Sequence, residues 1–373
     1  MNETQRDYRY MQRALKLARQ GAGRVEPNPM VGCVIVQGEK IVGEGFHTAF
    51  GRDHAEIEAL RNAGADAEGG TLYVNLEPCC HHGKTGPCTE AILTAKLARV
   101  VVANRDPFPQ VAGTGLASLR EHGLDVMTGV AAEEAEALNA PYFHYLQTNR
   151  PWVIAKWAMS LDGKMATTGG DSRWISNPRS RSIVHQIRGR VDAILIGRRT
   201  AELDDPQLTA RPPGPRTAVR IVLDSMAQLR TDSKLVRSAG EVPLMVVTGP
   251  QAPLEARSRL ENAGCELMFL DQEPQEGRSA KLHQLLERLG ERQMTNLLVE
   301  GGGKVLGSFF DAELINEVHT FIAPVLIGGE GVSPLGGSGA ESMDCVKRLE
   351  LFQTEQIDED WYISGRFPRK NDA

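Results

Sequence analysis

A histidine, a glutamate and two Pro-Cys pairs between residues 54 and 88 have the types and spacing of a catalytic zinc site. Such a site takes three protein ligands and keeps the fourth position for water, whose pKa the metal lowers. His54, Cys79 and Cys88 supply the three ligands for one Zn2+ ion per chain. Glu56 follows His54 by two residues and is the candidate general acid/base, which takes a proton from that water and delivers it to a leaving amine. The pattern therefore predicts a hydrolytic deamination.

The ligand assignment has alternatives, because the segment departs from the general H-x-E…P-C-x-x-C signature of zinc deaminases. The spacer between Cys79 and Cys88 is longer than in that signature. Cys80 could replace Cys79, and the Cys79…His82 spacing resembles a zinc knuckle, which would make a structural site with four ligands. A structural site leaves Glu56 without a role, so we favour the catalytic site. We expect both Pro-Cys pairs to open helices, since a helix N-terminus stabilises a thiolate.

Strands and helices alternate around these residues as in a layered α/β domain. Residues 31–47 predict a hairpin, and the stretch HAEIEALRNAG predicts a helix. The strand TLYVNL, a helix from Cys88 and the strand RVVVAN follow. Cys33, inside an apolar strand, is expected in the core. Gln147–Pro151 has turn chemistry, so we place a domain boundary there.

A second α/β domain is expected over residues 148–373, after a first domain of residues 1–147. The stretches PWVIAKWAMS, DAILIG, VRIVLD and PLMVVT predict strands, and Asn177-Pro178 predicts the start of a helix. The strand NLLVEGGG runs into glycines and then a helix, a junction where backbone N–H groups bind phosphate. These glycines match neither a P-loop nor the GxGxxG fingerprint, and a plain tight turn is the alternative.

Composition and charge exclude two classes of protein. The 373 residues carry 42 Lys and Arg against 48 Asp and Glu, and the net charge of −6 has the wrong sign for bulk nucleic-acid binding. No apolar run approaches the ~18 residues that span a bilayer, so we expect no membrane partner.

The N-terminal segment predicts an amphipathic helix and no export signal. We therefore expect a cytoplasmic protein whose six cysteines are thiols, packing residues or metal ligands.

With these motifs, residues 1–147 resemble the deaminase half of the bifunctional deaminase-reductases of riboflavin biosynthesis, members of the cytidine-deaminase superfamily. The matching motifs are Asn28-Pro29 before Val31-Gly32-Cys33-Val34, Gly45-Phe46-His47, His54-Ala55-Glu56, and Glu77-Pro78-Cys79 through Pro87-Cys88. The spacer between the two Pro-Cys pairs is itself typical of that family. The resemblance implies that the pyrimidine or its ribose phosphate contacts Asn28, His47, Glu77 and Lys84.

Residues 151–367 resemble the dihydrofolate-reductase-like reductase half of the same family. The matching motifs are KWAMSLDGK from Lys156, SRWIS from Ser172, DDPQLTAR from Asp204 and VEGG from Val299. The implied NADPH contacts are Ala158, Trp174, Thr200, Asp204, Ser225, Gly302, Gly303, Lys304, Val305, Leu306, Gly307 and Ser308. The implied substrate contacts are Ser172, Arg188, Leu208, Arg211 and Glu300.

The expected fold class is therefore α/β, with an N-terminal cytidine-deaminase-like α/β/α layered domain and a C-terminal dihydrofolate-reductase-like α/β domain. The resemblance implies two consecutive reactions on one small-molecule phosphoribosyl pyrimidine. The first exchanges an amine for oxygen, and the second uses NADPH to reduce the ribosyl group to a ribityl chain. The family also implies a homodimer or higher homo-oligomer. The alternative is a zinc deaminase of a nucleoside or tRNA with a non-catalytic C-terminal binding domain.

Several charged residues of the second domain are candidates for contacts with the substrate or the cofactor, or for proton transfer. Arg188 lies on or beside the apolar face of its helix, where a bound anion would explain it, and with Arg211 it could hold the substrate phosphate. The alternative is a pair of snorkelling or surface arginines. Arg198 and Arg199 could contact the extra phosphate of NADPH or form a solvated basic pair. The proton-donor candidates of the reduction are Lys156, Asp204 and Glu300.

Overall fold

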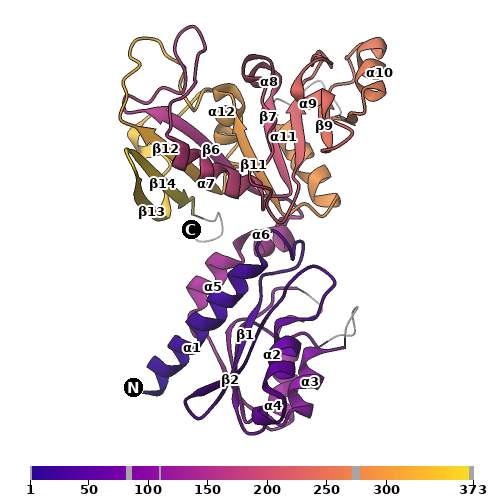
Figure 1. The fold of residues 1–373 in the computed structure, drawn as a ribbon, viewed down its shortest axis with the longest axis vertical. Coiled ribbons are helices and arrows are strands. Elements are labelled where there is room, and N and C mark those ends of the chain that lie inside the picture. Colours follow the sequence, from indigo (N-terminus) through magenta and orange to yellow (C-terminus); the bar gives the residue numbers. More distant parts are fainter. Residues whose placement is uncertain (1, 81–85, 109–110, 271–277, 369–373) are drawn as a thin grey trace. The chain divides into compact units, whose positions relative to one another are not determined.

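Helix α6 (Ala140–Thr148) ends where the chain passes from one folding unit to the next. The computed structural model describes residues 2–80, 86–108, 111–270 and 278–368 and divides the chain into units Met1–Asn149 and Arg150–Ala373 (Figure 1). Asn149 ends α6 in the left-handed conformation, with φ 53°. The helix thus continues through the first residues of the expected turn at Gln147–Pro151, and the chain turns only from Asn149.

The first unit is built on a five-stranded sheet in the order β2-β1-β3-β4-β5. β1 pairs antiparallel with β2 and β3, while β3, β4 and β5 are parallel. Its strands are β1 (Gly32–Gln37), β2 (Lys40–Phe46), β3 (Thr71–Leu76), β4 (Arg99–Asn104) and β5 (Asp125–Thr128). Its other helices are α1 (Glu3–Ala18), α2 (Ala55–Ala63), α3 (Cys88–Thr94), α4 (Thr114–Glu121) and α5 (Ala132–Leu138), with short 3-10 turns at Arg19–Gly21 and Gly64–Ala67. The expected hairpin, helices and strands around the cysteine-rich segment are confirmed.

Helices cover both faces of this sheet, which makes three layers. Figure 1 shows α1 and α5 on one side of the sheet and α2, α3 and α4 on the other. Alternate residues of β1 supply the two cores: Cys33 and Ile35 pack with α2, and Val34 and Val36 pack with α1. Cys33 is fully buried, as expected for a packing residue.

The second unit is built on a nine-stranded sheet in the order β10-β9-β8-β7-β11-β6-β12-β14-β13. The strands from β10 to β12 in this order are parallel, and β14 and β13 add an antiparallel edge. The strands are β6 (Trp152–Ser160), β7 (Ala193–Gly197), β8 (Val219–Leu223), β9 (Leu244–Thr248), β10 (Glu266–Phe269), β11 (Asn296–Gly301), β12 (Glu317–Ala323), β13 (Glu350–Ile357) and β14 (Asp360–Arg366). The helices are α7 (Pro178–Arg188), α8 (Arg198–Asp204), α9 (Lys234–Arg237), α10 (Leu254–Asn262), α11 (Arg278–Glu291) and α12 (Gly303–Asp311), with a 3-10 turn at Met343–Cys345.

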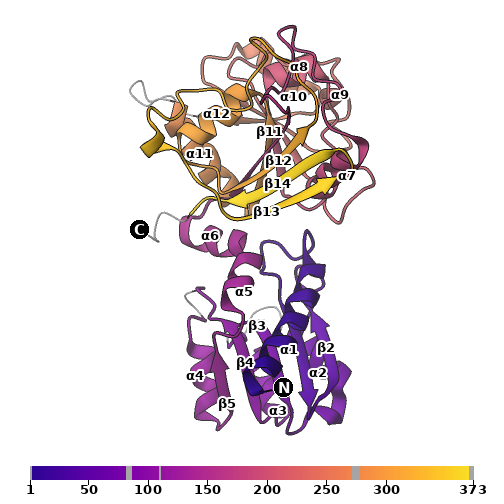
Figure 2. The same cartoon turned by 90° about the vertical axis from the view of Figure 1, so that its left-hand side faces the viewer.

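Along β11, apolar side chains point to one face of the sheet and Glu300 points to the other. Leu297 and Val299 belong to an apolar cluster with leucines of α11 and with Leu306 and Phe309 of α12. Figure 2 shows α11 and α12 next to each other on one side of the sheet. Glu300 faces the other way and contacts α7. The pairing of β11 with β7 shifts its register at Glu300, so this residue lies at a bulge.

Some elements of both units have no recognisable local pattern in the sequence. No pattern above predicts α5, α6 or the strands β12, β13 and β14. β13 carries mostly exposed side chains on the sheet edge, so it lacks the apolar alternation that marks a half-buried strand. In the residues that the structure describes, no helix is long and apolar enough to cross a membrane.

Candidate functional sites

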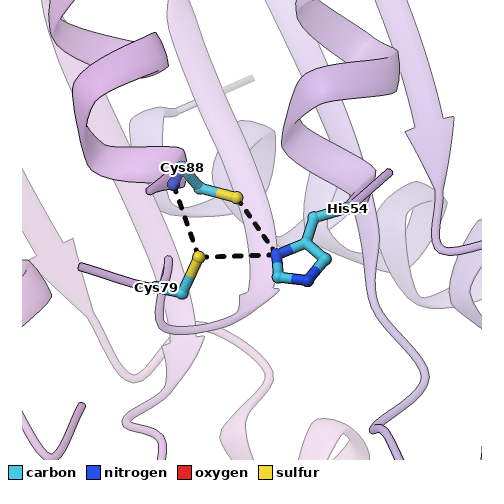
Figure 3. Close-up of side chains that lie close together, drawn as sticks. All are labelled: His54, Cys79 and Cys88. Carbon is cyan, nitrogen blue, oxygen red and sulfur yellow. Dashed lines mark hydrogen bonds between the residues drawn. The ribbon is translucent and has the colours of Figure 1, made fainter. Parts of the chain in front are cut away.

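His54, Cys79 and Cys88 come together in the first unit, as the zinc prediction requires (Figure 3). Their ligand atoms all lie within 4.8 Å of one another. The His54 Nδ1 atom is 3.3 Å from Cys88 Sγ and 3.4 Å from Cys79 Sγ, so this ring nitrogen faces both sulfurs. One imidazole nitrogen and two thiol sulfurs are the donor set that zinc prefers in deaminases. The residues therefore fit a zinc ion with three protein ligands.

The two cysteines reach the site in different ways. Cys88 is the first residue of α3, as expected for a Pro-Cys pair that opens a helix. The same expectation was wrong for Cys79, which lies in an irregular segment after β3. The Cys88 backbone N–H, however, donates to Cys79 Sγ over 3.4 Å. Hydrogen bonds from the Cys88 side chain, from His54 and from this N–H lower the pKa of the Cys79 thiol, so one helix N-terminus serves both sulfurs.

Glu56 is held next to the ligands by the first turn of α2. His54 is the residue before the helix, and Glu56 is its second residue and only 3% exposed. Burial raises the pKa of Glu56 to about 7, and its carboxyl group hydrogen-bonds with the Cys88 side chain. A carboxyl group that titrates near neutral pH can both take and return a proton, which suits a general acid/base.

Asn28 and His47 line the same site from two neighbouring loops. The Asn28 side-chain amide and His47 Nε2 are 3.2 Å apart, and the His47 ring meets the His54 ring edge-on at 5.5 Å. His47 Nδ1 lies 3.1 Å from the Asp53 carbonyl oxygen. Burial lowers the pKa of His47 and so favours its neutral form.

Two buried asparagines that sequence reasoning missed hold the Asn28 loop in place. The Asn75 side chain accepts from the Gly32 N–H at 2.8 Å and donates to the Met30 carbonyl at 3.0 Å. The Asn139 side chain accepts from the Met30 N–H and donates to the Met30 carbonyl, both at 2.9 Å. Asn75 lies in an apolar strand, where a buried amide needs partners, and this misplaced polarity is the signal that could have found it.

Glu77 is buried in this unit, but its carboxylate contacts the protein backbone. Oε2 accepts from the N–H groups of Asp106 at 3.2 Å and Gly113 at 3.0 Å, and Oε1 accepts from the Leu116 N–H at 3.2 Å. Glu77 therefore binds Asp106, Gly113 and the first turn of α4 to one another. Lys84, the fourth expected pyrimidine contact, lies outside the described residues, as does His82.

Cys80 points away from the zinc ligands toward another partner. Its Sγ atom lies 2.9 Å from the Thr114 hydroxyl at the start of α4. The cluster of metal-ligating groups in the described residues contains Cys79 and not Cys80. The geometry therefore favours Cys79 over Cys80 as the ligand.

In the second unit, Arg188 and Glu300 meet in a buried ion pair. Arg188 Nε lies 2.5 Å from Glu300 Oε1, and Nη2 lies 2.7 Å from Oε2. The expected anion beside Arg188 is thus a protein carboxylate. Burial opposes the charge of Glu300, but Arg188 outweighs it and lowers the pKa of Glu300. Arg188 Nη1 also donates to the Thr209 carbonyl at 3.4 Å.

Lys156 lies on the same sheet face as Glu300. Its strand β6 pairs in parallel with β11, and alternation places both side chains on the side away from α11 and α12. Burial lowers the pKa of Lys156, while the negative charge of Glu300 raises it. Of the three proton-donor candidates, Lys156 and Glu300 are therefore electrostatically coupled. The carboxyl of Asp204, at the end of α8, has its pKa raised by burial.

The glycine-rich stretch Gly302–Ser308 forms the start of α12, as the strand-glycine-helix pattern predicts. Gly302 has φ 71° and precedes the helix, and a Cβ built there would lie 2.9 Å from the Thr200 hydroxyl. A Cβ on Gly307 would lie 1.7 Å from the Gly336 carbonyl oxygen. The glycines therefore allow close approach of Thr200 on one side and of the Gly336 segment on the other. The expected NADPH contacts of this stretch are Gly302, Gly303, Lys304, Val305, Leu306, Gly307 and Ser308, and they share this one helix start.

The other expected contacts of this unit lie at strand ends and in loops. Trp174 is 71% exposed, with the Arg181 guanidinium 4.4 Å from its ring centre. Leu208 is buried in the left-handed conformation with φ 54°. Arg211 donates to the Gln207 side chain at 2.7 Å. Ala158 lies on β6, Ser172 in the loop after it, Thr200 and Asp204 on α8, and Ser225 after β8.

Arg198 and Arg199, the basic pair after β7, differ in their surroundings. Arg198 donates to Glu202 at 2.5 Å and lies 3.7 Å from the Asp224 carboxylate. Two acidic partners already occupy Arg198, so the expected contact with a cofactor phosphate is not favoured for it. Arg199 is exposed.

The folds and the two clusters define a zinc-dependent deaminase joined to a reductase domain. Residues 4–104 match the family model of the cytidine and deoxycytidylate deaminase zinc-binding region, and residues 151–363 match that of the RibD C-terminal domain. The chain belongs to the RibD family of riboflavin biosynthesis proteins. The expected family and fold class are confirmed.

Full-length relatives and solved structures agree with this assignment. The chain is 40% identical to riboflavin biosynthesis protein RibD of Actinobacillus pleuropneumoniae over 359 residues, which are 96% of this chain and 94% of that protein. It is 39% identical to RibD of Aquifex aeolicus over 358 residues, 96% of this chain and 97% of that one. A structure of Acinetobacter baumannii RibD matches with a TM-score of 0.85 and 34% identity, over 98% of this chain and 100% of that one. The Thermotoga maritima diaminohydroxyphosphoribosylaminopyrimidine deaminase/5-amino-6-(5-phosphoribosylamino)uracil reductase matches with the same TM-score, identity and coverage.

Proposed function

We propose that this chain catalyses two consecutive steps of riboflavin biosynthesis. The first is zinc-dependent hydrolytic deamination of 2,5-diamino-6-(5-phosphoribosylamino)pyrimidin-4-one to 5-amino-6-(5-phosphoribosylamino)uracil. The second is NADPH-dependent reduction of the ribosyl group to give 5-amino-6-(5-phosphoribitylamino)uracil. The observation that carries the proposal is the His54, Cys79 and Cys88 cluster beside buried Glu56, in a chain whose RibD relatives match both units.

In the deamination, the first unit binds and orients the pyrimidine and moves protons. Zinc held by His54, Cys79 and Cys88 would supply a water activated for attack on the carbon that bears the amine. Glu56 accepts a proton and returns it to the leaving amine, a role that its pKa of about 7 supports. Asn28 offers its side-chain amide to the pyrimidine.

His47 and Lys84 are the further contacts that we propose for the pyrimidine or its ribose phosphate. His47 is buried next to Asn28 and His54. We assign Glu77 to holding Asp106, Gly113 and the start of α4 in place, because both of its carboxylate oxygens accept backbone N–H groups.

In the reduction, the second unit binds the cofactor and the substrate against one face of its sheet. NADPH supplies the hydride. The start of α12 binds cofactor phosphate through backbone N–H groups and Lys304. We propose that the coupled Lys156 and Glu300 side chains face the ribosyl group and that Lys156 donates the proton needed as the ring opens, because burial favours release of its proton.

Further proposed contacts with the substrate and with NADPH come from other residues of the second unit. We propose that Arg211 contacts the substrate phosphate and that Arg188, already paired with Glu300, orients that carboxylate toward the substrate. Ser172 and Leu208 complete the substrate contacts, and Ala158, Trp174, Thr200, Asp204 and Ser225 complete those of NADPH.

The alternative function is deamination of a nucleoside or tRNA with a non-catalytic second unit. It is not favoured, because the RibD relatives cover nearly the whole chain and the RibD C-terminal model covers residues 151–363. We further propose that the enzyme works in the cytoplasm as a homodimer or higher homo-oligomer.

One experiment tests both steps. Purified zinc-loaded protein is given the diamino phosphoribosylamino pyrimidine, with and without NADPH, and the products are followed by mass spectrometry. We expect exchange of amine for oxygen without NADPH, and a gain of two hydrogens only when NADPH is added. Deamination without any reduction would favour the alternative, and the absence of both reactions would refute the proposal.

A further inference from the structure

A buried carboxylate of the C-terminal hairpin contacts the first turn of α7. Asp360, the first residue of β14, is 1% exposed. Its Oδ2 atom accepts from the Asn177 N–H at 2.8 Å and from the Ser180 hydroxyl at 2.6 Å. The Asn177 side-chain amide donates back to the Ile357 carbonyl at 2.7 Å, at the end of β13. The turn between β13 and β14 is therefore bound to the start of α7 from both sides.

This contact lies at the end of the helix where a negative charge is most stabilising. Asn177 is the N-cap of α7, and its side-chain oxygen accepts from the Ser180 N–H at 2.8 Å. Asp360 adds a carboxylate at the same terminus, where it accepts the Asn177 N–H near the positive end of the helix dipole. Asn177 and Ser180 are both buried. Hydrogen bonds of fixed direction between buried groups restrict how the helix can tilt. The other Asp360 oxygen, Oδ1, is buried without a partner among the described residues, so the anchor rests on Oδ2 alone.

Helix α7 touches expected contacts of the reductase site near both of its ends. In its first turns, the Arg181 guanidinium lies over the Trp174 ring and also donates to the Ser176 carbonyl. At its last residue, Arg188 forms the ion pair with Glu300. A change in the orientation of this helix would therefore disturb the contacts of both Trp174 and Glu300.

Because α7 is long, a small tilt at its N-terminal end becomes a larger displacement at its C-terminal end. The helix has 11 residues, which at 1.5 Å per residue is about 16 Å. A tilt of about 5° at the Asp360 end would move the Arg188 end by about 1.4 Å. Displacements of about 1 Å at a reacting centre can lower rates by about a hundredfold. A contact that lies far from the reacting atoms, such as that of Asp360, can therefore affect the rate of the reduction.

We propose that Asp360 is a positioning residue of the reductase site, which orients α7 and through it Trp174 and the Arg188–Glu300 pair. The inference rests on the proposed function of the second unit. Nothing in it involves the first unit, so deamination serves as an internal reference in every variant.

The main comparison is Asp360→Ala against Asp360→Asn. Alanine leaves the Asn177 N–H and the Ser180 hydroxyl without their acceptor, whereas asparagine retains an oxygen that accepts both. We expect Asp360→Ala to raise the reductase KM for the phosphoribosyl substrate and to lower reductase kcat/KM by about tenfold or more. Asp360→Asn should restore kcat/KM to within about threefold of the unmodified protein. Deaminase turnover and zinc content should stay unchanged in both.

A matched control lies two residues away in the same turn. Asp358 forms an exposed ion pair with Arg179 of the same helix at 3.1 Å. Because exposed pairs contribute little, we expect Asp358→Ala to leave both activities within about twofold of the unmodified protein. Should Asp360→Ala fail to fold, Ser180→Ala removes only one of the two hydrogen bonds and should give a smaller increase of the same reductase KM.

A second measurement does not depend on activity. Hydrogen-deuterium exchange of residues 172–188 should be faster in Asp360→Ala than in the unmodified protein and in Asp358→Ala. If the unmodified protein deaminates but does not reduce, the proposed function fails, and the exchange measurement still decides whether Asp360 orders α7. Folded Asp360→Ala and Ser180→Ala variants with unchanged reductase kinetics and unchanged exchange would overturn the proposal, as would a parallel loss of deamination and reduction.

Discussion

Arg188 and Glu300 form a two-pronged ion pair that leaves their side chains only 14% and 6% exposed. Each nitrogen of the pair faces one carboxylate oxygen, at 2.5 and 2.7 Å. Two opposite charges removed from water stabilise each other only in such a geometry, and either charge alone is costly there. The pair therefore links α7 to β11, in addition to the role that we propose for it at the substrate site.

Arg188→Ala should impair both stability and substrate binding. Loss of the guanidinium leaves a buried, uncompensated Glu300, so we expect about 3–5 kcal/mol less free energy of unfolding for the second unit, together with a raised reductase KM. Urea denaturation and steady-state kinetics measure the two effects. The control is Arg211→Ala, whose exposed side chain contacts Gln207 and Thr209, and which should raise KM without a comparable loss of stability. An Arg188→Ala protein as stable as the unmodified one would contradict the buried pair.

Cys79→Ser should abolish zinc binding, whereas Cys80→Ser should not. Cys79 Sγ faces His54 Nδ1 at 3.4 Å, while Cys80 Sγ faces the Thr114 hydroxyl. Metal analysis of the purified variants by mass spectrometry distinguishes the two neighbours. Zinc retained in Cys79→Ser but lost in Cys80→Ser would reverse the ligand assignment.

Glu56→Gln should stop deamination without removing the metal. The amide has nearly the same shape as the carboxyl group but cannot transfer a proton, and general acid/base catalysis contributes about 10²–10⁴ in rate. We expect kcat of deamination to fall by about that factor, with zinc content and the reduction of separately supplied deaminated substrate unchanged. Deamination at the unmodified rate would refute the acid/base assignment.

Gly307→Ala should weaken NADPH binding. A Cβ at this position would overlap the Gly336 carbonyl oxygen at 1.7 Å, so α12 and the segment around Gly336 must separate. Overpacking of this kind costs about 1–3 kcal/mol, and we expect a raised KM for NADPH with unchanged deamination. Gly240→Ala is the control in the same unit, because a Cβ there meets nothing within 4 Å. Equal KM values in the two variants would show that α12 does not bind the cofactor tightly.

The second unit should lose stability in acid because of Glu317. Burial disfavours its charge, but hydrogen bonds and charge from His319 and Arg366 lower the pKa of Glu317 to about 2, from an ordinary 4.5. A lowered folded-state pKa contributes stability above pH 4.5 that is lost as the pH falls toward about 2. The contribution is about 3 kcal/mol at neutral pH.

Denaturation curves between pH 7 and pH 3 test this dependence. We expect Glu317→Gln to be less stable than the unmodified protein at pH 7 and to lose less stability on acidification. Glu355→Gln, on the exposed strand β13, is the matched control and should follow the unmodified protein. Identical acid profiles for Glu317→Gln and the unmodified protein would contradict the prediction.

Local sequence signals were sufficient for the metal cluster and the glycine-rich helix start. Glu56, in the first turn of α2, follows the N-cap His54 by two residues, and the Pro-Cys pairs have a recognisable spacing, so short-range patterns were enough to propose a zinc site. The strand-glycine-helix pattern at β11 and α12 is equally local. The sequence by itself thus determined the α/β alternation and the kinds of zinc donor, while the choice of Cys79 over Cys80 came from the tertiary structure.

Only the tertiary structure decided which distant residues are partners. Cys79 obtains its helix N–H from Cys88, and Arg188 meets Glu300, which is 112 residues away in the chain. Asp360 binds Ser180 across 180 residues. Such pairs have no local periodicity or spacing, because a buried charge is satisfied by whichever group the folded sheet brings within about 3 Å. The folding of the chain, and no motif within it, therefore determined the partners of these buried side chains.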